Sequence, residues 1–311
     1  MAFRPARALV TGGAGFIGSH LAEVLLEREV EVTVLDNLST GQRSNVPESA
    51  RFIEASILDE SSVEEALRDC EAVFHLAAQV SVPESMERPV QSITTNATGT
   101  LLLLERARRA GVKRFIYSSS SAVYGESPAS PKREDLAPEP ISPYGVGKLA
   151  GEEYVSAYAR CYGMQTASLR YFNVFGPRQR HDSPYAAVIP IFLSQMREGK
   201  PLTVYGDGEQ TRDFTFVADI VQANLKAMES ERLDGEVFNI ACGRSISLNE
   251  LIRTLAAVFG QEPEVRYLPP RPGDIKHSSA DIRKAQERLG YSPQFTLEEG
   301  LRRTIEPIET Q

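Results

Sequence analysis

The glycine-rich segment near the N-terminus constrains this chain more than any other feature. Residues 11–18 read TGGAGFIG, directly after the apolar run ARALVT at 6–11 and directly before a helical pattern at 17–28. Glycines between a strand and a helix let backbone N–H groups approach a pyrophosphate at the helix N-terminus. The segment therefore predicts a dinucleotide-binding turn that opens an α/β fold.

Asp36 sharpens this interpretation. It ends a second apolar run, EVTVLD at 31–36, and lies 18 residues after Gly18. At this place a carboxylate accepts hydrogen bonds from a ribose 2′-hydroxyl and repels a 2′-phosphate. The spacing favours NAD over NADP as the cofactor. A glycine-rich turn that is not followed by an acidic residue at this spacing can instead serve helix–strand packing alone.

Further apolar and β-branched runs alternate with helical patterns. We expect strands at 51–57, 72–78, 114–120 and 166–173, with helices at 61–68, 95–110 and 143–162. Such alternation is typical of a parallel sheet with right-handed crossovers and helices on both faces. The predicted fold class is therefore α/β, with a Rossmann-type doubly wound sheet.

The regular alternation ends after the strand at 166–173, where prolines, glycines and aromatic residues are interleaved. Two later apolar patterns, at 217–228 and 236–241, have the form of elements that return to the first sheet. We expect an NAD-binding domain over 1–170 that also includes 213–241. A smaller C-terminal α/β substrate lobe would take 171–212 and 242–311. A segment rich in Pro, Glu and Asp, at 127–143, predicts a long loop over a site.

Charge and cysteine content narrow the function classes. The formal net charge of −8 repels polyanions and no basic stripe reverses it, so we expect no nucleic-acid partner. Cys70, Cys161 and Cys242 lie far apart without a CxxC pair, which indicates reduced thiols and no metal site. No apolar run approaches the length of a membrane span, and no signal-like segment opens the chain. We expect a cytoplasmic protein without membrane association.

Tyr144 and Lys148 are four residues apart on a predicted helix, so their side chains share one face. A tyrosine that acts as a base near pH 7 needs its pKa lowered by about three units, or roughly 4 kcal/mol. A lysine charge about 5 Å away supplies roughly 3 kcal/mol at an effective dielectric of about 20, and a positive nicotinamide ring adds more. Beside a dinucleotide loop, and after the strand-end serines at 118–121, the pair indicates catalysis.

Eight sequence blocks then resemble one family in their order along the chain. They are TGGAGFIGSH, DNLSTG, HLAAQVSVPES, YSSSSAVYG, SPYGVGK, LRYFNVFGPRQ, YGDGEQTRDFTFV and RPGD. Together they resemble the extended short-chain dehydrogenase/reductases, and within these the UDP-glucose and UDP-N-acetylglucosamine 4-epimerases. The resemblance implies an NAD-dependent isomerase of galactose metabolism that inverts carbon 4 of a UDP-hexose through a 4-keto sugar.

The resemblance also implies residue roles. Tyr144 would be the general base and acid, Lys148 its electrostatic partner and a ligand of the nicotinamide ribose, and Ser120 the hydroxyl that links Tyr144 to the sugar. The implied cofactor contacts are Gly12, Gly15, Phe16, Ile17, Gly18, Asp36, Asn37, Ser39, Gly41, Ser56, Ile57, Leu76, Ala77, Ala78, Asn96, Ser118, Tyr144, Lys148 and Tyr171. Ser56 departs from the family, since many relatives carry an aspartate there to face the adenine.

The implied substrate contacts lie in the second lobe and at the catalytic serine. They are Ser120, Asn173, Tyr205, Arg212, Arg271, Asp274 and Ser278. Arg212 and Arg271 would bind the diphosphate, because bidentate arginine suits phosphate oxygens. In relatives restricted to glucose and galactose a bulky aromatic stands where this chain has Ser278. The smaller serine predicts that a 2-acetamido group is also accepted.

Other activities of the same superfamily remain open from the sequence. A nucleotide-sugar 4,6-dehydratase usually has an Asp-Glu pair where this chain has Ser121 and Ala122. A UDP-glucuronate epimerase or decarboxylase needs contacts to a 6-carboxylate, and the sequence does not locate them. A non-catalytic NAD-sensing protein commonly loses the Tyr or the Lys, and both are present here. By analogy with the family, the helices at 95–110 and 144–162 predict a homodimer seam.

Overall fold

The computed structural model describes residues 3–181, 186–270 and 276–305. Its centre is a parallel seven-stranded sheet in the order β11-β6-β5-β4-β1-β2-β3. The strands are β1 (Arg7–Thr11), β2 (Glu31–Asp36), β3 (Arg51–Glu54), β4 (Ala72–His75), β5 (Arg114–Ser120), β6 (Gln165–Tyr171) and β11 (Asp234–Ile240). From β1 the chain adds β2 and β3 on one side, and then β4, β5 and β6 on the other side. The strand order therefore reverses between β1 and β4, and ligands bind at the carboxyl ends of the strands at such a switch point. The predicted Rossmann-type doubly wound fold is confirmed, and the expected strand at 236–241 does return to this sheet.

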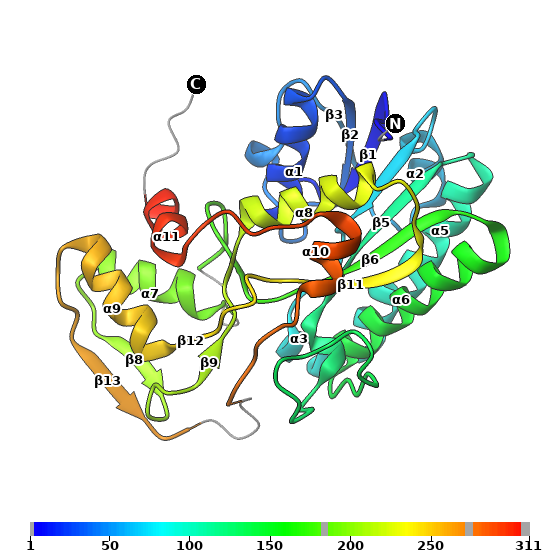
Figure 1. Cartoon of the computed structure of the whole chain (residues 1–311). Coiled ribbons are helices and arrows are strands. Elements are labelled where there is room, and N and C mark those ends of the chain that lie inside the picture. The colour runs from blue at the N-terminus through cyan, green and yellow to red at the C-terminus, as the bar shows by residue number, and fades with distance from the viewer. Residues whose placement is uncertain (1–2, 182–185, 271–275, 306–311) are drawn as a thin grey trace.

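Helices cover both faces because successive strand residues point to opposite sides. On one face α1 (Phe16–Glu27), α8 (Val217–Glu229) and α10 (Arg283–Leu289) share a core with strand residues such as Val10. On the other face α2 (Glu60–Ala66), α5 (Gly99–Arg109) and α6 (Pro143–Tyr162) share a core with strand residues such as Leu9. Figure 1 shows the two helical layers on either side of the sheet.

A smaller lobe lies beside this sheet (Figure 1). Its core is built around Phe175, Phe192 and Leu251. The elements that enclose this core are α7 (Val188–Arg197), α9 (Leu248–Phe259) and α11 (Leu297–Ile305), with the strand pairs β7 (Val174–Phe175) and β10 (Thr215–Phe216), β9 (Thr211–Arg212) and β12 (Ile246–Ser247), and β8 (Leu202–Tyr205) and β13 (Val265–Leu268). The predicted second α/β lobe is therefore present.

Two expectations need correction. Ala285, Leu289 and Tyr291 belong to the first core, although the sequence pattern places 242–311 in the substrate lobe. They do so because α10 covers the outer strand β11 and packs beside α8. The expected helix at 95–110 is present, but it begins with a π-helical turn (Thr94–Thr98) before α5, and two short helices that were not expected, α3 (Val82–Glu87) and α4 (Pro89–Ile93), precede it. The other domain boundaries stay a prediction. No helix within the described ranges is both long and apolar enough to span a membrane.

Candidate active site

The glycine loop between β1 and α1 packs so closely on the surrounding backbone that it leaves no room for side chains at Gly12 and Gly18. Gly12 has φ +72°, and a Cβ there would lie 2.7 Å from the backbone nitrogen of Ala77. A Cβ on Gly18 would lie 2.2 Å from the carbonyl oxygen of Gly12, and Gly15 is the N-cap residue of α1. Only glycine fits this close approach. The loop thus forms a compact backbone cradle at a helix N-terminus, and such a loop suits the pyrophosphate of a dinucleotide.

Asp36 stands at the carboxyl end of β2 beside this cradle. Its Oδ2 accepts a hydrogen bond from the Ala14 N–H at 3.0 Å, and its Oδ1 accepts one from the Leu38 N–H at 2.8 Å. The side chain is buried, and burial raises the pKa of the carboxyl above its usual range. The segment with the predicted contacts Asn37, Ser39 and Gly41 packs on the loop, since a Gly41 Cβ would lie 2.9 Å from Ala14.

The loop after β4 forms the opposite wall of the cradle. The Leu76 N–H donates to the Thr11 carbonyl at 3.1 Å, and Ala77 follows it. Asn96 in the π-helical turn fixes the end of this loop. Its Oδ1 accepts from the Gln79 N–H at 2.8 Å, and its Nδ2 donates to the Gln79 carbonyl at 2.9 Å. Asn96 therefore acts on the loop that carries the predicted cofactor contacts at 76–78.

Three further predicted cofactor residues have defined surroundings. Ile57 is buried, and the Ser56 hydroxyl accepts a hydrogen bond from the Leu58 N–H at 3.2 Å. The Tyr171 hydroxyl accepts one from Asn224 of α8 at 2.8 Å, and burial raises the pKa of Tyr171 to about 12. Tyr171 is therefore a neutral, fixed hydroxyl at the end of β6.

Tyr144 and Lys148 lie in the first two turns of α6. The helix begins here because Ser142 caps it by accepting a hydrogen bond from the Gly145 N–H at 3.1 Å, and Pro143 occupies the first helical position. The Tyr144 N–H donates to the Ser85 hydroxyl at 3.2 Å. Lys148 Nζ donates to the Ser118 carbonyl at 2.7 Å and lies 6.0 Å from the centre of the Tyr144 ring. The sequence spacing thus produces the expected juxtaposition against the end of β5.

The electrostatics of this pair differ from the sequence-based expectation. Burial raises the pKa of the Tyr144 phenol above 10, and a hydrogen bond with Ser120 acts in the opposite direction. Burial also lowers the pKa of Lys148 to about 7, against the charge of Glu152. Lysine and serine alone therefore leave Tyr144 protonated at neutral pH. Desolvation, which spacing along a helix does not reveal, is the stronger effect here.

Three predicted substrate residues line one pocket of about 500 Å³. Asn173, Tyr205 and Arg212 reach it from the end of β6, from β8 and from β9. Ser278 lies next to this wall, because its N–H donates to the Thr211 carbonyl at 3.1 Å. Arg271 and Asp274 lie outside the described residues. Ser120, Tyr144 and Lys148 do not line this pocket, but Ser120 on β5 pairs in register with Tyr171 on β6, two residues before the pocket residue Asn173.

Sequence reasoning missed several residues near the site. Gln195 on α7 lines the substrate pocket, and within the described residues its buried Oε1 has no hydrogen-bond partner. Glu152 and Arg170 form a buried ion pair beneath the catalytic pair. The spacing of Glu152, one helical turn after Lys148, was the available signal. A glutamine on an otherwise apolar helix face was the signal for Gln195.

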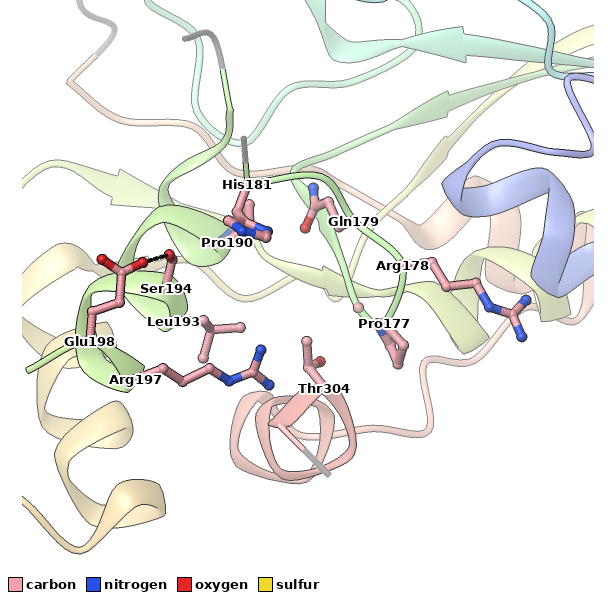
Figure 2. A pocket seen from close by; sticks show the side chains of 11 residues that line it. Pro177, Arg178, Gln179, His181, Pro190, Leu193, Ser194, Arg197, Glu198 and Thr304 are labelled. Carbon is pink, nitrogen blue, oxygen red and sulfur yellow. Dashed lines mark hydrogen bonds between the residues drawn. The ribbon is translucent and has the colours of Figure 1, made fainter. Parts of the chain in front are cut away.

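A second pocket of about 250 Å³ lies behind the loop at 176–181. Figure 2 shows its lining from this loop, α7 and Thr304 of α11, with the guanidinium of Arg178 turned away toward α1. There Arg178 donates to Glu23 at 2.5 Å. None of the predicted catalytic or substrate residues line this pocket, so we do not assign it to the active site.

The chain is similar to proteins of known family. The model of the NAD dependent epimerase/dehydratase family matches residues 8–241. A putative UDP-glucose 4-epimerase of Methanocaldococcus jannaschii is 42% identical over 299 residues, which cover 96% of each chain. The structure of the Thermotoga maritima UDP-glucose 4-epimerase with UDP-glucose is 46% identical, with a TM-score of 0.92 over 96% of this chain and 97% of the other. The UDP-glucose 4-epimerase of Thermus thermophilus in complex with NAD is 40% identical, with a TM-score of 0.88 and the same coverage.

Similarity also extends to other reactions. The UDP-glucuronic acid 4-epimerase of Bacillus cereus, solved with UDP-glucuronic acid and NAD, is 37% identical, with a TM-score of 0.88 over 96% of this chain and 98% of the other. A UDP-N-acetyl-alpha-D-glucosaminuronate decarboxylase of Bacillus cytotoxicus is 36% identical over 318 residues, which cover 96% of this chain and 97% of the relative. Overall similarity therefore identifies the family and the cofactor. It does not identify the sugar substrate, which has to be inferred from the residues of the site.

Proposed function

The chain belongs to the NAD dependent epimerase/dehydratase family and uses NAD, and from this premise we propose that it inverts carbon 4 of UDP-hexoses through a 4-keto sugar. The observation that carries the proposal is the position of Tyr144 and Lys148. They lie at the end of β5, between the glycine cradle at β1 and the pocket lined by Asn173 and Arg212. In this arrangement Tyr144 can act as the base on the sugar, while the pocket holds the nucleotide part of the substrate.

When bound, NAD supplies a reversible hydride acceptor for carbon 4. Tyr144 removes the proton of the 4-hydroxyl and returns it after inversion. The proton passes between the sugar and Tyr144 through Ser120, whose hydroxyl interacts with the phenol and opposes the rise in its pKa. Lys148, held by the Ser118 carbonyl, stabilises the phenolate. The remaining shift in the Tyr144 pKa is expected from the positive charge of the nicotinamide ring.

Inversion requires the keto sugar to present both faces in turn. The substrate pocket is suited to this, because its polar groups Asn173, Tyr205 and Arg212 can hold the nucleotide part of the substrate. A UDP group fixed there leaves the hexose free to rotate about the phosphate linkage. The dehydratase alternative is disfavoured because Ser121 and Ala122, in the 3₁₀ turn after β5, provide no carboxyl group for water elimination.

A nuclear magnetic resonance time course tests the proposal. Purified protein is mixed in parallel with UDP-glucose, UDP-N-acetylglucosamine and UDP-glucuronate, without added NAD. We expect the galacto epimers of the first two sugars. A 4-keto-6-deoxy product or a pentose product would assign one of the alternative reactions, and no product even with NAD supplied would support an NAD-sensing role.

The substrate range should depend on Ser278. Its N–H donates to the carbonyl of Thr211, the residue between the pocket residues Gln210 and Arg212, and we propose that this serine leaves space for a 2-acetamido group. Ser278→Tyr should reduce kcat/KM for UDP-N-acetylglucosamine at least about 100-fold, while UDP-glucose changes less than about 3-fold. Steady-state kinetics with both sugars measure this ratio, and Ser279→Tyr serves as the neighbouring control. Equal losses on both sugars would show that Ser278 does not select the substrate.

We propose that the chain is a homodimer whose seam includes α4 and α6. Val90 on α4 is 78% exposed, and Val146 on the adjacent α6 is 45% exposed. Leu103 and Leu104, on the helix expected to form part of the seam, are buried inside the monomer. The exposed side chains of Val90 and Val146 therefore make the α4–α6 surface the part of the expected seam that is available to a partner.

Val90→Asp should convert a dimer into a monomer, because a carboxylate at the centre of an apolar interface loses its hydration. Tyr267→Asp is the control, since Tyr267 is a similarly exposed apolar residue on β13 of the other lobe. Sedimentation velocity measures both masses. A dimeric Val90→Asp protein, or a wild type that is already monomeric, would contradict the proposed seam.

A further inference from the structure

A buried ion pair lies directly beneath the candidate catalytic pair. Arg170 on β6 donates to Glu152 on α6 through Nε at 2.8 Å and Nη2 at 2.6 Å, and each side chain is 3% exposed. Replacing such a pair by apolar residues is often neutral or stabilising, because both charges lose their hydration. Stability alone therefore gives no reason for charges at this place.

A third side chain completes the cluster. The Ser119 hydroxyl on β5 donates a hydrogen bond to Glu152 Oε1. Ser119 and Arg170 are partners in the register of β5 and β6. The Glu152 carboxylate therefore joins α6 to the carboxyl ends of two adjacent strands.

The residues on either side of Ser119 hold the catalytic side chains. The Ser118 carbonyl accepts the hydrogen bond of Lys148 Nζ at 2.7 Å, and the Ser120 hydroxyl, which accepts a hydrogen bond from the Ala122 N–H at 3.1 Å, interacts with the Tyr144 phenol and opposes the rise in its pKa. Lys148 and Glu152 are one turn apart on the same helix. A displacement of Ser119 relative to α6 would therefore change both contacts to the catalytic pair.

We propose that Ser119 is a positioning residue, which through Glu152 and Arg170 fixes the end of β5 against α6 and so sets the contacts of Ser120 and Lys148 with Tyr144. The inference deepens the proposed function and rests on it, because this placement matters for a phenol that exchanges a proton. The Ser119 hydroxyl itself is directed to Glu152.

The groups around Lys148 make its charge state depend on the position of β5 relative to α6. Tyr144 and Glu152 face it from α6, Tyr117 from β5 and His75 from β4. Burial lowers the pKa of His75 to about 3, so this ring is neutral near pH 7. Glu152, whose own charge is matched by Arg170, is then the anion that opposes the desolvation of the lysine. Loosening β5 would weaken the support that Lys148 and Ser120 give to an ionised Tyr144.

The test removes the Ser119 hydroxyl and leaves the ion pair intact, because removal of Glu152 would leave Arg170 buried without its counter-charge. Ser119→Ala removes the link, and Ser119→Thr restores a hydroxyl. Ser168→Ala is the matched control, since Ser168 is a buried serine on β6 whose hydroxyl has no hydrogen-bond partner within the described residues. All three are measured as folded, NAD-loaded proteins with circular dichroism as the check on folding.

Two readouts are needed. The first is kcat and KM for UDP-glucose. Ser119→Ala should lower kcat about 10-fold with KM within about 2-fold, because misplaced catalytic groups act on the chemical step. The second does not depend on turnover. It is the pKa of the Tyr144 phenol, followed by ultraviolet absorption against the Tyr144→Phe protein, and it should rise by about one unit in Ser119→Ala.

The expected pattern is a loss in Ser119→Ala, recovery in Ser119→Thr and no change in Ser168→Ala. If Ser119→Ala keeps the wild-type Tyr144 pKa, or if Ser168→Ala shows the same changes, the positioning role is wrong. If the wild type epimerises no UDP-hexose, the proposed function fails, and the phenol titration still decides whether Ser119 positions the pair.

Discussion

Tyr144→Phe should lower kcat for UDP-glucose about 10³-fold while bound NAD stays at the wild-type level. The substitution removes only the hydroxyl that exchanges a proton with carbon 4, and general acid–base groups contribute on this scale. The ring keeps its partly buried place, and the backbone of residue 144 keeps its hydrogen bond to Ser85. Steady-state kinetics and the NAD content of the purified protein measure the two quantities.

Tyr158→Phe is the control for this result. Tyr158 lies on the same helix, and its hydroxyl bonds to Glu105, away from the site. It should retain nearly full activity. If Tyr144→Phe keeps more than about one tenth of the wild-type kcat, Tyr144 is not the base in this protein.

The second large effect is expected at the glycine cradle. Gly12→Ala should abolish retention of NAD, because its Cβ would lie 2.7 Å from the Ala77 backbone, and the loop at 76–78 would have to move out of the cofactor wall. The positive φ adds a strain of about 1 kcal/mol. We expect the purified variant to carry no NAD and to lose activity at ordinary NAD concentrations.

Gly111→Ala isolates the steric part of this effect. Gly111 has φ +76°, close to the φ +72° of Gly12, but a Cβ there meets no atom within 4 Å. Both variants therefore carry the same backbone strain, and only Gly12→Ala has the collision. Cofactor content by absorbance after denaturation compares them. Equal NAD retention in the two variants would mean that the loop does not form the cofactor site.

The fold could be predicted from the sequence because the strands of the central sheet are short apolar runs that alternate with helical patterns. Ser142 and Pro143 mark the start of α6 at the residue where the pattern predicts it. The interrupted helix before α5 was not predicted, because a π-helical turn leaves no distinct pattern of apolar residues. The position of α10 was missed for a different reason. Its apolar residues match any core, and only the three-dimensional arrangement shows that they cover β11.

The site was predictable where residue spacing along one element determines geometry, as for Tyr144 and Lys148. It was not predictable where distant segments meet. Glu152 and Arg170 come from different elements, and their mutual burial is a property of the folded chain. The same is true of the raised Tyr144 pKa, which follows from desolvation. The roles of the individual cofactor and substrate residues stay predictions until variants are measured.

The most direct test of the account follows the hydrogen of carbon 4. UDP-glucose carrying deuterium at carbon 4 is converted by the purified protein in ordinary water, and the product is examined by nuclear magnetic resonance. The account predicts UDP-galactose that retains deuterium at carbon 4, because the hydrogen removed from the sugar returns to it inside the site. UDP-galactose with protium at carbon 4, or an absence of UDP-galactose, would contradict it.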